Sequence, residues 1–509
     1  MNYKKNYNNN NYNNNYNNNY NNNIIKTKEL ISPSALGLFA RINKGLGTNL
    51  QIVGGWVRDA ILGVTPKDLD FVIPYGVRDI MEFESFLATI PGVQILPKGG
   101  ERFQICTFTF GGEEFDAAMP RTEAYTAGSR KPAVKVATLC EDSQRRDFTV
   151  NALYCDIEGV ITDPTGRGVD DCNKGILHFA GNPDVTFVED PIRILRAVRF
   201  EATKGFSIDE ETLIAMKAHA ADFKVGGDYI SWDRIGEEIR KIFTKAPNGG
   251  SEWAIRRLHE VGVMQEILPE FSAAWGFDQK NPHHEECLSD HLLSSLQKAE
   301  KVYDGDMRFI IRVAALLHDI AKPACQTQLE GEDFCRYMGH DRVSADAAEK
   351  ICLRFKWTSE EAKMIAFIIS RHMRLTDTIK GGHWTGSDAA MRRAVKDFTL
   401  NGDKADGQGE KVDLRKECLA IIAGDKLSHR NADDWAGAAK EFFDLSEALA
   451  AKDARRAAFK IDGNVVIKRF GLAGRQIGDA IRKLTALSEE RDFGSFDDLL
   501  DYASANGVI

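Results

Sequence analysis

The sequence predicts a mixed α/β domain at the front of the chain and an all-helical body behind it. Up to about residue 170, short β-type segments separated by glycine turns alternate with short helical segments. From Asp190 onward, amphipathic helical patterns follow one another with few strand patterns between them. The length of 509 residues is enough for roughly two to four domains, so both parts are expected in one chain.

The elements of the front part follow from turn residues and hydrophobic periodicity. Ser32, Ser34 and the apolar run to Leu46 predict a first helix. The segments expected after it are a strand at Leu50–Val53, a Gly54-Gly55 turn, a helix at Trp56–Leu62, a strand at Leu69–Ile73 closed by Pro74, and a hairpin of Phe103–Phe110 and Glu114–Ala118 joined at Gly111-Gly112.

The body is expected to consist of helical blocks. The first block contains helical patterns at Pro191–Glu201, Asp209–Ala221 and Ile230–Phe243, before a break at Asn248-Gly249-Gly250. A second block runs from near Asn281 to about Arg430. A final helical segment covers Ala432–Ile509, with a glycine-marked turn from Gly471 to Gly478.

Composition narrows the class of protein. The hydrophobic content of 43% is typical of a globular chain, and no run of about 18 apolar residues predicts a membrane span. The polar first residues predict no signal peptide. The net charge of −9 argues against a generic nucleic-acid coat, although an enzyme that binds RNA through local basic strips is compatible with it.

Two further features of composition concern the cysteines and the first residues. The nine cysteines are scattered, odd in number and without a C-x-x-C pair, which predicts free thiols in a reducing, cytoplasmic compartment. Residues 1–23 are almost entirely Asn and Tyr. Such a tract cannot bury a core, so a disordered tail is expected over residues 1–29.

Three aspartates form the first chemical constellation. On a strand, residues i and i+2 point to the same face, so Asp68 and Asp70 are expected to project together. Asp116 is expected on a neighbouring strand. Converging carboxylates repel one another, and divalent cations relieve the repulsion. Such a cluster can hold Mg²⁺ ions about 3.5–4 Å apart, which activate an attacking hydroxyl and steady a departing pyrophosphate.

The residues around the aspartates reduce the chance that D-x-D is only a solvated turn. Gly54-Gly55 opens a helix whose amides can cradle phosphates, and Arg58 on that helix adds positive charge. The segment from Gly54 to Gly63 followed by Lys67–Val72 resembles motif A of the nucleotidyltransferase superfamily. It is similar to the class II branch, which contains CCA-adding enzymes and bacterial poly(A) polymerases.

A second constellation resembles motif B of that branch. Arg145, Arg146, Asp147 and Asn151 lie in the run R-R-D-F-T-V-N-A. The resemblance implies that they bind the ribose and triphosphate of an incoming nucleotide. Arginine presents a fork of donors to phosphate, and aspartate accepts from a ribose hydroxyl. The alternative is a surface cluster of salt bridges.

Asp190 and Arg193 lie in a run that resembles motif D, followed by Arg196 and Arg199. On a helix, Asp190 and Arg193 would share a face at i and i+3. Cytosine and adenine each present an amino donor beside a ring-nitrogen acceptor, and a carboxylate beside a guanidinium matches both. Guanine and uracil present a carbonyl acceptor beside an N–H donor. The carboxylate would then face an acceptor, and the guanidinium would face a donor. The alternative is an intrahelical ion pair.

Two weaker matches lie between these motifs. The segment from Phe115 to Tyr125 resembles the one that leads into a mobile loop of full CCA-adding enzymes. Asp163, Gly166 and the pair Asp170-Asp171 resemble the hinge motif C, although a D-x-x-G run can also be a simple turn.

A third constellation lies in the rear half. Neutral histidines and carboxylates together make transition-metal or Mg²⁺ sites. The order H…HD…D that the HD superfamily requires is supplied by His291, His318, Asp319 and Asp425. His340 and His372 are expected to bind substrate phosphate or a further metal, whereas His283, His284 and His429 are interpreted as structural. The chain departs from the usual H-D-I-G-K at Ala321, where glycine is common.

The resemblance covers roughly residues 30–505 and implies the organisation of the chain. The expected parts are a disordered tail at 1–29, a polymerase-beta-like nucleotidyltransferase head at 30–180, a helical nucleotide-recognition and RNA-binding region at 181–280, an HD phosphohydrolase domain at 281–430 and a helical tRNA-binding tail at 431–509.

The implied function is addition and repair of the tRNA 3′-terminal CCA from CTP and ATP. The implied partners are the tRNA acceptor arm and these nucleotides, with no membrane and with a monomeric or dimeric state. The implied cofactors are Mg²⁺ at the transferase site and Ni²⁺, Mn²⁺ or Mg²⁺ at an HD site with phosphatase and 2′,3′-cyclic phosphodiesterase activity. The alternatives are a poly(A) polymerase with the same head and an HD hydrolase whose head only binds RNA.

Overall fold

The computed structural model describes residues 24–100, 104–124, 133–226, 230–281, 286–331, 333–375, 378–380, 382–401, 411–429, 434–458, 461–491 and 493–509. The chain divides into two compact units, one containing the residues up to Ala273 with Ile351–Thr358, the other containing Ala274–Lys350 and Ser359–Ile509. The expectations for residues 1–23, Tyr125, His283 and His284 lie outside the described ranges.

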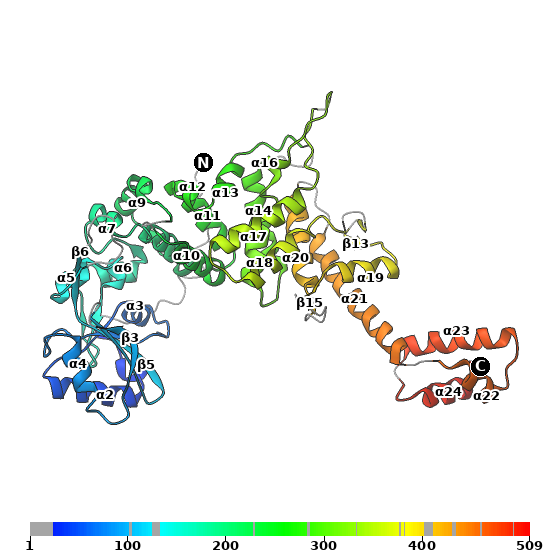
Figure 1. Ribbon diagram of the computed structural model, residues 1–509, viewed down its shortest axis with the longest axis horizontal. Coiled ribbons are helices and arrows are strands. Elements are labelled where there is room, and N and C mark those ends of the chain that lie inside the picture. Colours follow the sequence, from blue (N-terminus) through cyan, green and yellow to red (C-terminus); the bar gives the residue numbers. More distant parts are fainter. Residues whose placement is uncertain are drawn as a thin grey trace. The chain divides into compact units, whose positions relative to one another are not determined.

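The first unit contains a seven-stranded mixed sheet in the order β3-β4-β5-β2-β1-β8-β9 (Figure 1). Its central pair, β2 and β5, is parallel, and the other pairings are antiparallel. The strands of this sheet are β1 (Gln51–Val53), β2 (Asp70–Val72), β3 (Gln94–Gly100), β4 (Ile105–Phe110), β5 (Glu113–Ala118), β8 (Tyr154–Cys155) and β9 (Ile161–Thr162). The predicted strands are therefore confirmed within the described residues, as is the hairpin at Gly111-Gly112, while Phe103 lies outside the described ranges.

Two helices cover one face of this sheet through aromatic side chains. Helix α2 (Pro33–Leu46) begins after the N-cap Ser32, whose side chain accepts from the Ala35 amide. Phe39 of α2 packs edge-on against Phe71 of β2, with ring centroids 4.8 Å apart. Helix α4 (Ile80–Leu87) reaches the same core through a ring contact with β4. The core fixes the register of β2 beside β5.

The disordered tail predicted over residues 1–29 extends too far. Ile25 is buried, and its amide donates to the Gly159 carbonyl. The Thr27 hydroxyl donates to the Ile157 carbonyl at 2.6 Å. These contacts anchor the chain from residue 24 onward, because two apolar residues, Ile24 and Ile25, follow the Asn-rich tract.

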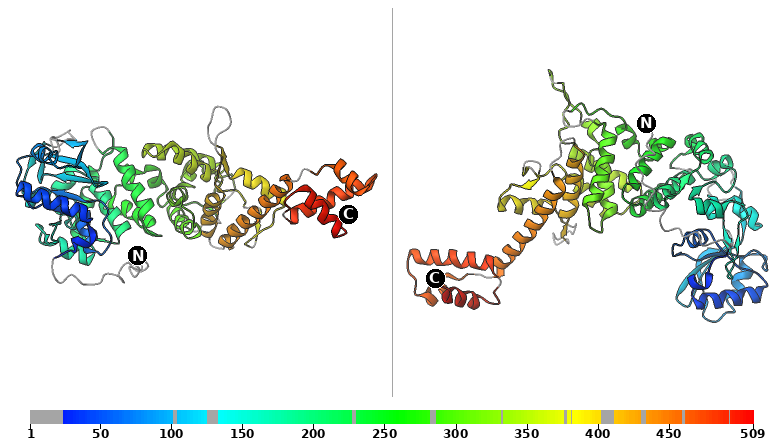
Figure 2. Two further views of the ribbon diagram at one scale, coloured as in Figure 1. Left: turned by 90° about the horizontal axis from the view of Figure 1, so that it is seen from below. Right: turned by 180° about the vertical axis from the view of Figure 1, so that it is seen from behind.

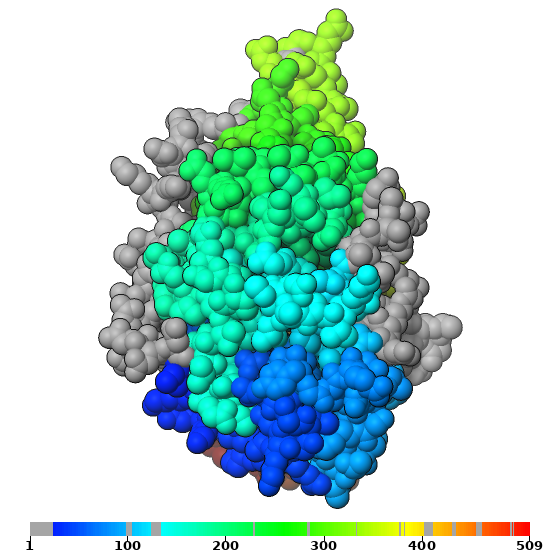
Figure 3. Space-filling model, turned by 90° about the vertical axis from the view of Figure 1, so that its left-hand side faces the viewer, coloured from blue at the N-terminus to red at the C-terminus, as the bar shows by residue number. Residues whose placement is uncertain are grey.

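The rest of the first unit is mainly helical, as expected after Asp190. Helix α8 packs against α10 and α11. The helices of this part are α7 (Pro183–Glu189), α8 (Arg193–Lys204), α9 (Glu210–Ala218), α10 (Trp232–Lys245), α11 (Gly250–Val261), α12 (Met264–Ile267) and α13 (Pro269–Ala274). Figure 3 shows the surface of this unit, where the blue and cyan segments of the head adjoin the green helical segments.

In the second unit, α14 packs against α15 and α20, and α15 packs against α18 (Figures 1 and 2). The helices of this bundle are α14 (Leu288–Val302), α15 (Arg308–Leu317), α16 (Lys322–Cys325), α17 (His340–Arg354), α18 (Ser359–Ile369) and α20 (Arg415–Leu427). The helical block expected from near Asn281 to about Arg430 also contains two short strand pairs, β12-β13 and β14-β15, which flank α19 (Asp388–Asp397).

The end of the chain is helical, as predicted, and its last three helices share a small core of their own. The helices are α21 (Trp435–Ala458), α22 (Gly463–Phe470), α23 (Arg475–Glu490) and α24 (Phe496–Ala505). The predicted turn from Gly471 to Gly478 is too long. Gly471 and Gly474 adopt the positive φ values of 66° and 56°, whereas Gly478 lies within α23. Among the described residues, no helix is long and apolar enough to cross a membrane.

Candidate transferase and metal sites

Two of the three predicted aspartates of the head lie side by side on neighbouring strands. Asp70 of β2 and Asp116 of β5 are register partners in the parallel pair. Asp68 lies just before β2, so the expectation that it belongs to the strand is wrong, because only three residues pair there. All three side chains are accessible to solvent. An ion can therefore reach them.

Asp116 and Asp68 lie close enough to Asp70 to affect its ionisation. The pKa of Asp70 is raised to about 6, first by desolvation in the surrounding protein and then by repulsion from Asp116 and Asp68. Arg146 has a smaller, opposite effect and lowers this pKa. The Thr107 hydroxyl of β4 donates to Asp116 Oδ1 at 2.5 Å. Oxygen donors with mutual repulsion fit a hard cation such as Mg²⁺.

The glycine turn lies beside the aspartates, but Arg58 does not project into open space. Gly54 adopts φ 71° at the start of α3 (Gly55–Ile61), and a Cβ placed there would lie 3.5 Å from Arg146 Nη1. Arg58 is buried and donates to Asn151 Oδ1 at 2.5 Å and to Asp59 Oδ1 at 2.9 Å. Arg146 is thus the cation beside both the turn and Asp70.

A buried carboxylate that the sequence analysis missed organises the arginine pair. Asp142 is fully buried in α5 (Leu139–Gln144) and accepts from Arg145, Arg146, the Tyr154 hydroxyl and the Arg121 amide. Burial alone would raise the pKa of Asp142, but the two arginines lower it. The i+3 and i+4 spacing of Arg145 and Arg146 from Asp142 is the pattern that could have identified it.

Asp147 is enclosed by partners of its own chain. Its Oδ2 accepts from Arg196 at 2.9 and 2.5 Å, and its Oδ1 accepts from Asn151 Nδ2 at 3.0 Å. Burial would raise the pKa of Asp147, yet Arg196 and Asn151 lower it to about 2. These contacts favour a role in holding the 149–151 turn to α8 over direct contact with a ribose.

A second buried carboxylate, Glu238 of α10, anchors the remaining arginines. Its Oε2 accepts from Arg199 Nε at 2.5 Å, and its Oε1 lies 3.7 Å from Arg196 Nη1. Glu238 lies in the apolar stripe of Ile235 and Ile242, and a carboxylate in such a stripe is a pattern that indicates a buried partner.

Asp190 and Arg193 do not lie on one helix. Asp190 follows α7 with φ −147° and ψ 84°, and α8 begins at Arg193. The predicted i and i+3 pairing is therefore wrong, because the Asp190 backbone is extended and Pro191 follows it. Arg193 Nη2 donates to the Arg145 carbonyl at 2.6 Å, whereas Asp190 Oδ2 accepts from Arg234 Nη2 at 2.8 Å.

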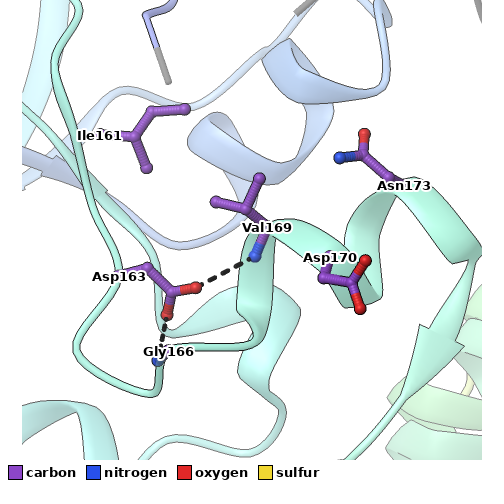
Figure 4. Close-up of a pocket in the computed structure, with 6 residues that line it drawn as sticks. All are labelled: Ile161, Asp163, Gly166, Val169, Asp170 and Asn173. Carbon is purple, nitrogen blue, oxygen red and sulfur yellow. Dashed lines mark hydrogen bonds between the residues drawn. The ribbon is translucent and has the colours of Figure 1, made fainter. Parts of the chain in front are cut away.

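The motif C residues form a turn beside a pocket of about 500 Å³ (Figure 4). Asp163 Oδ1 accepts from the amides of Thr165 and Gly166, and Oδ2 accepts from the Val169 amide. Asp171 is buried and accepts from the Thr149 hydroxyl at 2.6 Å. The Asp171 bond ties this segment to the 149–151 turn, whereas the Asp163 bonds stay within the segment itself.

In the second unit, the four predicted HD residues converge from three places in the bundle. Ligand atoms of His291, His318, Asp319 and Asp425 all lie within 4.8 Å of one another, and all four residues are buried. His291 Nε2 lies 3.3 Å from His318 Nε2 and 3.2 Å from Asp425 Oδ1. The prediction of this group from its H…HD…D order is supported by the geometry.

A second group shares Asp319 with the first. Asp319, His340 and His372 also place ligand atoms within 4.8 Å of one another. Asp319 Oδ2 faces His291 at 3.3 Å, whereas Oδ1 faces His340 at 3.0 Å and His372 at 3.4 Å. One carboxylate therefore bridges two donor groups.

The orientation of the rings matches metal ligation. Nδ1 of His318, His340 and His372 lies 2.8, 2.6 and 2.7 Å from the carbonyl oxygen three positions earlier. With Nδ1–H donated to those carbonyls, each Nε2 carries a lone pair that faces carboxylate oxygens. Acceptors that face acceptors in a buried site need a cation between them, so the residues fit divalent metal ions.

Basic residues balance this centre. Lys322 Nζ lies 2.6 Å from Asp319 Oδ2, and Lys426 Nζ lies 2.9 Å from Asp425 Oδ2. Burial would raise the pKa values of both aspartates, but the lysines lower them well below their usual range. His429 lies 3.5 Å from Asp425, so it adjoins the centre rather than a separate structural region. The turn at Ala321 needs no glycine, because its φ is −93°.

Comparisons with known proteins match both the head and the HD region of the chain. Family models match for the poly A polymerase head domain at residues 50–178, the probable RNA and SrmB-binding site of polymerase A at 205–274 and the HD domain at 288–422. The multifunctional CCA protein of Stenotrophomonas maltophilia is 31% identical over 338 residues, which are 64% of this chain and 76% of that protein. The chain belongs to the multifunctional CCA protein family. The family member from Neisseria gonorrhoeae is 33% identical over 328 residues, 63% of this chain and 73% of that protein.

Solved structures share the fold of this family member. The Thermotoga maritima CCA-adding enzyme complexed with tRNA has a TM-score of 0.54 at 18% identity, covering 94% of this chain and 97% of that one. The Bacillus stearothermophilus CCA-adding enzyme in complex with CTP has a TM-score of 0.51 at 18% identity, covering 94% and 100%. A mixed-sheet head followed by a helical body with an HD domain, as the sequence predicts, is therefore confirmed, and the chain is an enzyme of this family.

Proposed function

We propose that this enzyme adds and repairs the 3′-terminal CCA of tRNA, using CTP and ATP and releasing pyrophosphate. The meeting of Asp70 and Asp116 in one parallel strand pair, with Asp68 beside them, carries the proposal. Relatives named multifunctional CCA proteins support CCA addition over poly(A) synthesis. The buried histidine centre in the rear unit supports the same conclusion, since the HD-bearing branch is the one that the sequence resembles.

The oxygen ligands of the head suit Mg²⁺, which Asp68, Asp70 and Asp116 would hold. A bound Mg²⁺ lowers the pKa of an attacking 3′-hydroxyl and neutralises charge at the transferring phosphate. The protein's own contribution is orientation. Arg146 supplies positive charge beside the Gly54 turn, where the triphosphate is expected to lie.

Nucleotide choice is assigned to Asp190 and Arg193. Arg193 is buried and its Nη1 has no hydrogen-bond partner among the described residues, so it is available to a ring-nitrogen acceptor. Asp190 supplies a carboxylate for an amino group. Their separate backbone positions do not prevent joint recognition, because the Arg193 amide still donates to the Asp190 carbonyl at 3.2 Å.

The remaining nucleotide-site residues act mainly through one another. Arg145, Asp147, Asn151, Arg196 and Arg199 form ion pairs and hydrogen bonds within the chain. They therefore position the 149–151 turn and helix α8. The placement of Arg146 and Arg193 depends on these two elements.

The histidine centre supports a metal-dependent phosphohydrolase. His291, His318, Asp319 and Asp425 would hold one ion, and Asp319, His340 and His372 a second. Nitrogen and oxygen ligands together suit Ni²⁺ or Mn²⁺ as well as Mg²⁺. Metal ions at such a site activate water for attack on a phosphoester. Phosphatase and 2′,3′-cyclic phosphodiesterase reactions are the proposed activities.

The tRNA acceptor arm is the proposed macromolecular partner, and the C-terminal helices are proposed to bind it. The cytoplasm is the proposed location, since all nine cysteines are free thiols.

The proposal is tested with a tRNA transcript that lacks CCA and all four nucleoside triphosphates. Sequencing of the product 3′ ends is expected to show C, C and A in that order. Asp70→Asn should abolish addition. Asp163→Asn alters a carboxylate of the motif C turn and should still add C, C and A in that order. Long A tracts would favour the poly(A) polymerase, and no addition by the unaltered chain would refute the proposal.

A further inference from the structure

The two base-reading residues differ in how the chain satisfies them. Arg193 Nη2 donates to the Arg145 carbonyl at 2.6 Å, but its buried Nη1 has no partner among the described residues. Asp190 is in the opposite situation, because its Oδ2 accepts from Arg234 Nη2 at 2.8 Å. Arg193 therefore has an N–H donor that is unpaired within the described part of the chain, whereas the Asp190 carboxylate already accepts a hydrogen bond from Arg234.

This asymmetry matters for an incoming base. Its ring nitrogen would accept from Arg193 Nη1, which has no hydrogen bond to a described residue to give up. Its exocyclic amino group needs the Asp190 carboxylate, where the guanidinium of Arg234 already donates. An amino N–H and a guanidinium N–H are donors to the same acceptor, so the base and Arg234 compete for Asp190.

We infer that Arg234 competes with cytosine and adenine for Asp190, and that it holds the place of their amino group before the base binds. The inference rests on the proposed function and deepens it. An amino-bearing base replaces the Arg234 donor and leaves Asp190 satisfied. A keto-bearing base brings no donor to that position, so Asp190 keeps Arg234 and the base finds no partner there.

The surroundings of the pair make this exchange easy. The side chains of Arg234 and Asp190 are 48% and 21% exposed, so their attraction is weakened by solvent. Arg234 is also the third residue of α10, where a positive charge is disfavoured by the helix dipole. An exposed ion pair of this kind changes an equilibrium by at most about fivefold, which corresponds to about 1 kcal/mol.

The test is steady-state kinetics of Arg234→Gln with CTP and ATP on tRNAs that end before C or before A. Removing the competitor is expected to lower KM for both nucleotides two- to fivefold with kcat unchanged. The difference from the unaltered enzyme should shrink as salt rises, because salt screens the ion pair. Arg234→Lys keeps a cationic donor and should have a KM near that of the unaltered enzyme.

A matched control is Arg78→Gln, which removes an exposed arginine from an ion pair with Glu82 elsewhere in the head. This control should leave both KM values unchanged. A higher KM or a lower kcat in Arg234→Gln would overturn the inference, since Arg234 would then support Asp190 instead of competing for it. Arg234→Met gives the same test if the first variant does not fold. Failure of the unaltered enzyme to add C or A would instead refute the proposed function.

Discussion

The hydroxyl of Thr107 provides a sharp test of how the head positions its carboxylates. Thr107 of β4 lies opposite Asp116 of β5 and is nearly buried. Its Oγ1 donates to Asp116 Oδ1 at 2.5 Å and leaves the other oxygen of that carboxylate for an ion. Thr107→Val keeps the shape of the side chain and removes only this hydrogen bond.

The expected loss follows from the strength of hydrogen bonds to charged groups. Such bonds contribute about 1.5–3 kcal/mol, which corresponds to about a tenfold to hundredfold change. We expect kcat for C addition to fall within this range and the Mg²⁺ concentration needed for half-maximal rate to rise. Because valine fills the same buried space, the variant should remain folded at the assay temperature, and thermal unfolding checks this.

The assay is single-turnover addition of CMP to a truncated tRNA at several Mg²⁺ concentrations. Thr107→Ser restores a hydroxyl and should recover most of the rate. If Thr107→Val adds CMP at the unaltered rate and at the unaltered Mg²⁺ requirement, Asp116 is not held by Thr107 for catalysis, and the reasoning fails.

Three further predictions concern stability and metal content. Asp147→Asn should lower the unfolding free energy at pH 7 by about 2 kcal/mol, because the folded pKa of about 2 lies nearly two units below the usual value. That contribution is present above about pH 4 and is lost as the pH falls toward 2. In denaturant titrations between these pH values, the unfolding free energy of the variant should therefore depend less on pH than that of the unaltered chain. An equal pH dependence would contradict the assignment. Glu300→Gln should cost about 3–5 kcal/mol in the same measurement, since Arg312 is fully buried against Glu300 at 2.7 Å; a cost below about 1 kcal/mol would argue against this pair. His372→Ala should reduce bound Mn²⁺, measured by elemental analysis after dialysis, from two ions per chain to one, and an unchanged content would exclude a second ion at this histidine.

The sequence predicted the parts whose local chemistry is strong. Gly54-Gly55 requires a turn between apolar segments, and the apolar run after Asp70 predicts a strand. His318 and Asp319, with His291 and Asp425, are ligand types that bind divalent metal ions, and their order along the chain indicated the group. These features depend on residue type and short spacing, and the structure retains them.

The sequence could not predict contacts made by distant residues. Nothing near Asp190 indicates that Arg234 pairs with it, and the extended backbone before Pro191 overrides the apparent helical spacing. The ties of Arg58 to Asn151 and of Arg199 to Glu238 likewise depend on how elements pack. Arginines expected to meet a nucleotide are therefore partly occupied by partners of the chain.

The central claim is that two separate sites perform two reactions, and a reciprocal pair of variants tests it most directly. Asp116→Asn and Asp319→Asn are each assayed for CMP and AMP addition to truncated tRNA and for Mn²⁺-dependent hydrolysis of 2′,3′-cyclic AMP. We predict that the first variant loses addition and keeps hydrolysis, and that the second does the reverse. Full addition by Asp116→Asn would contradict the account.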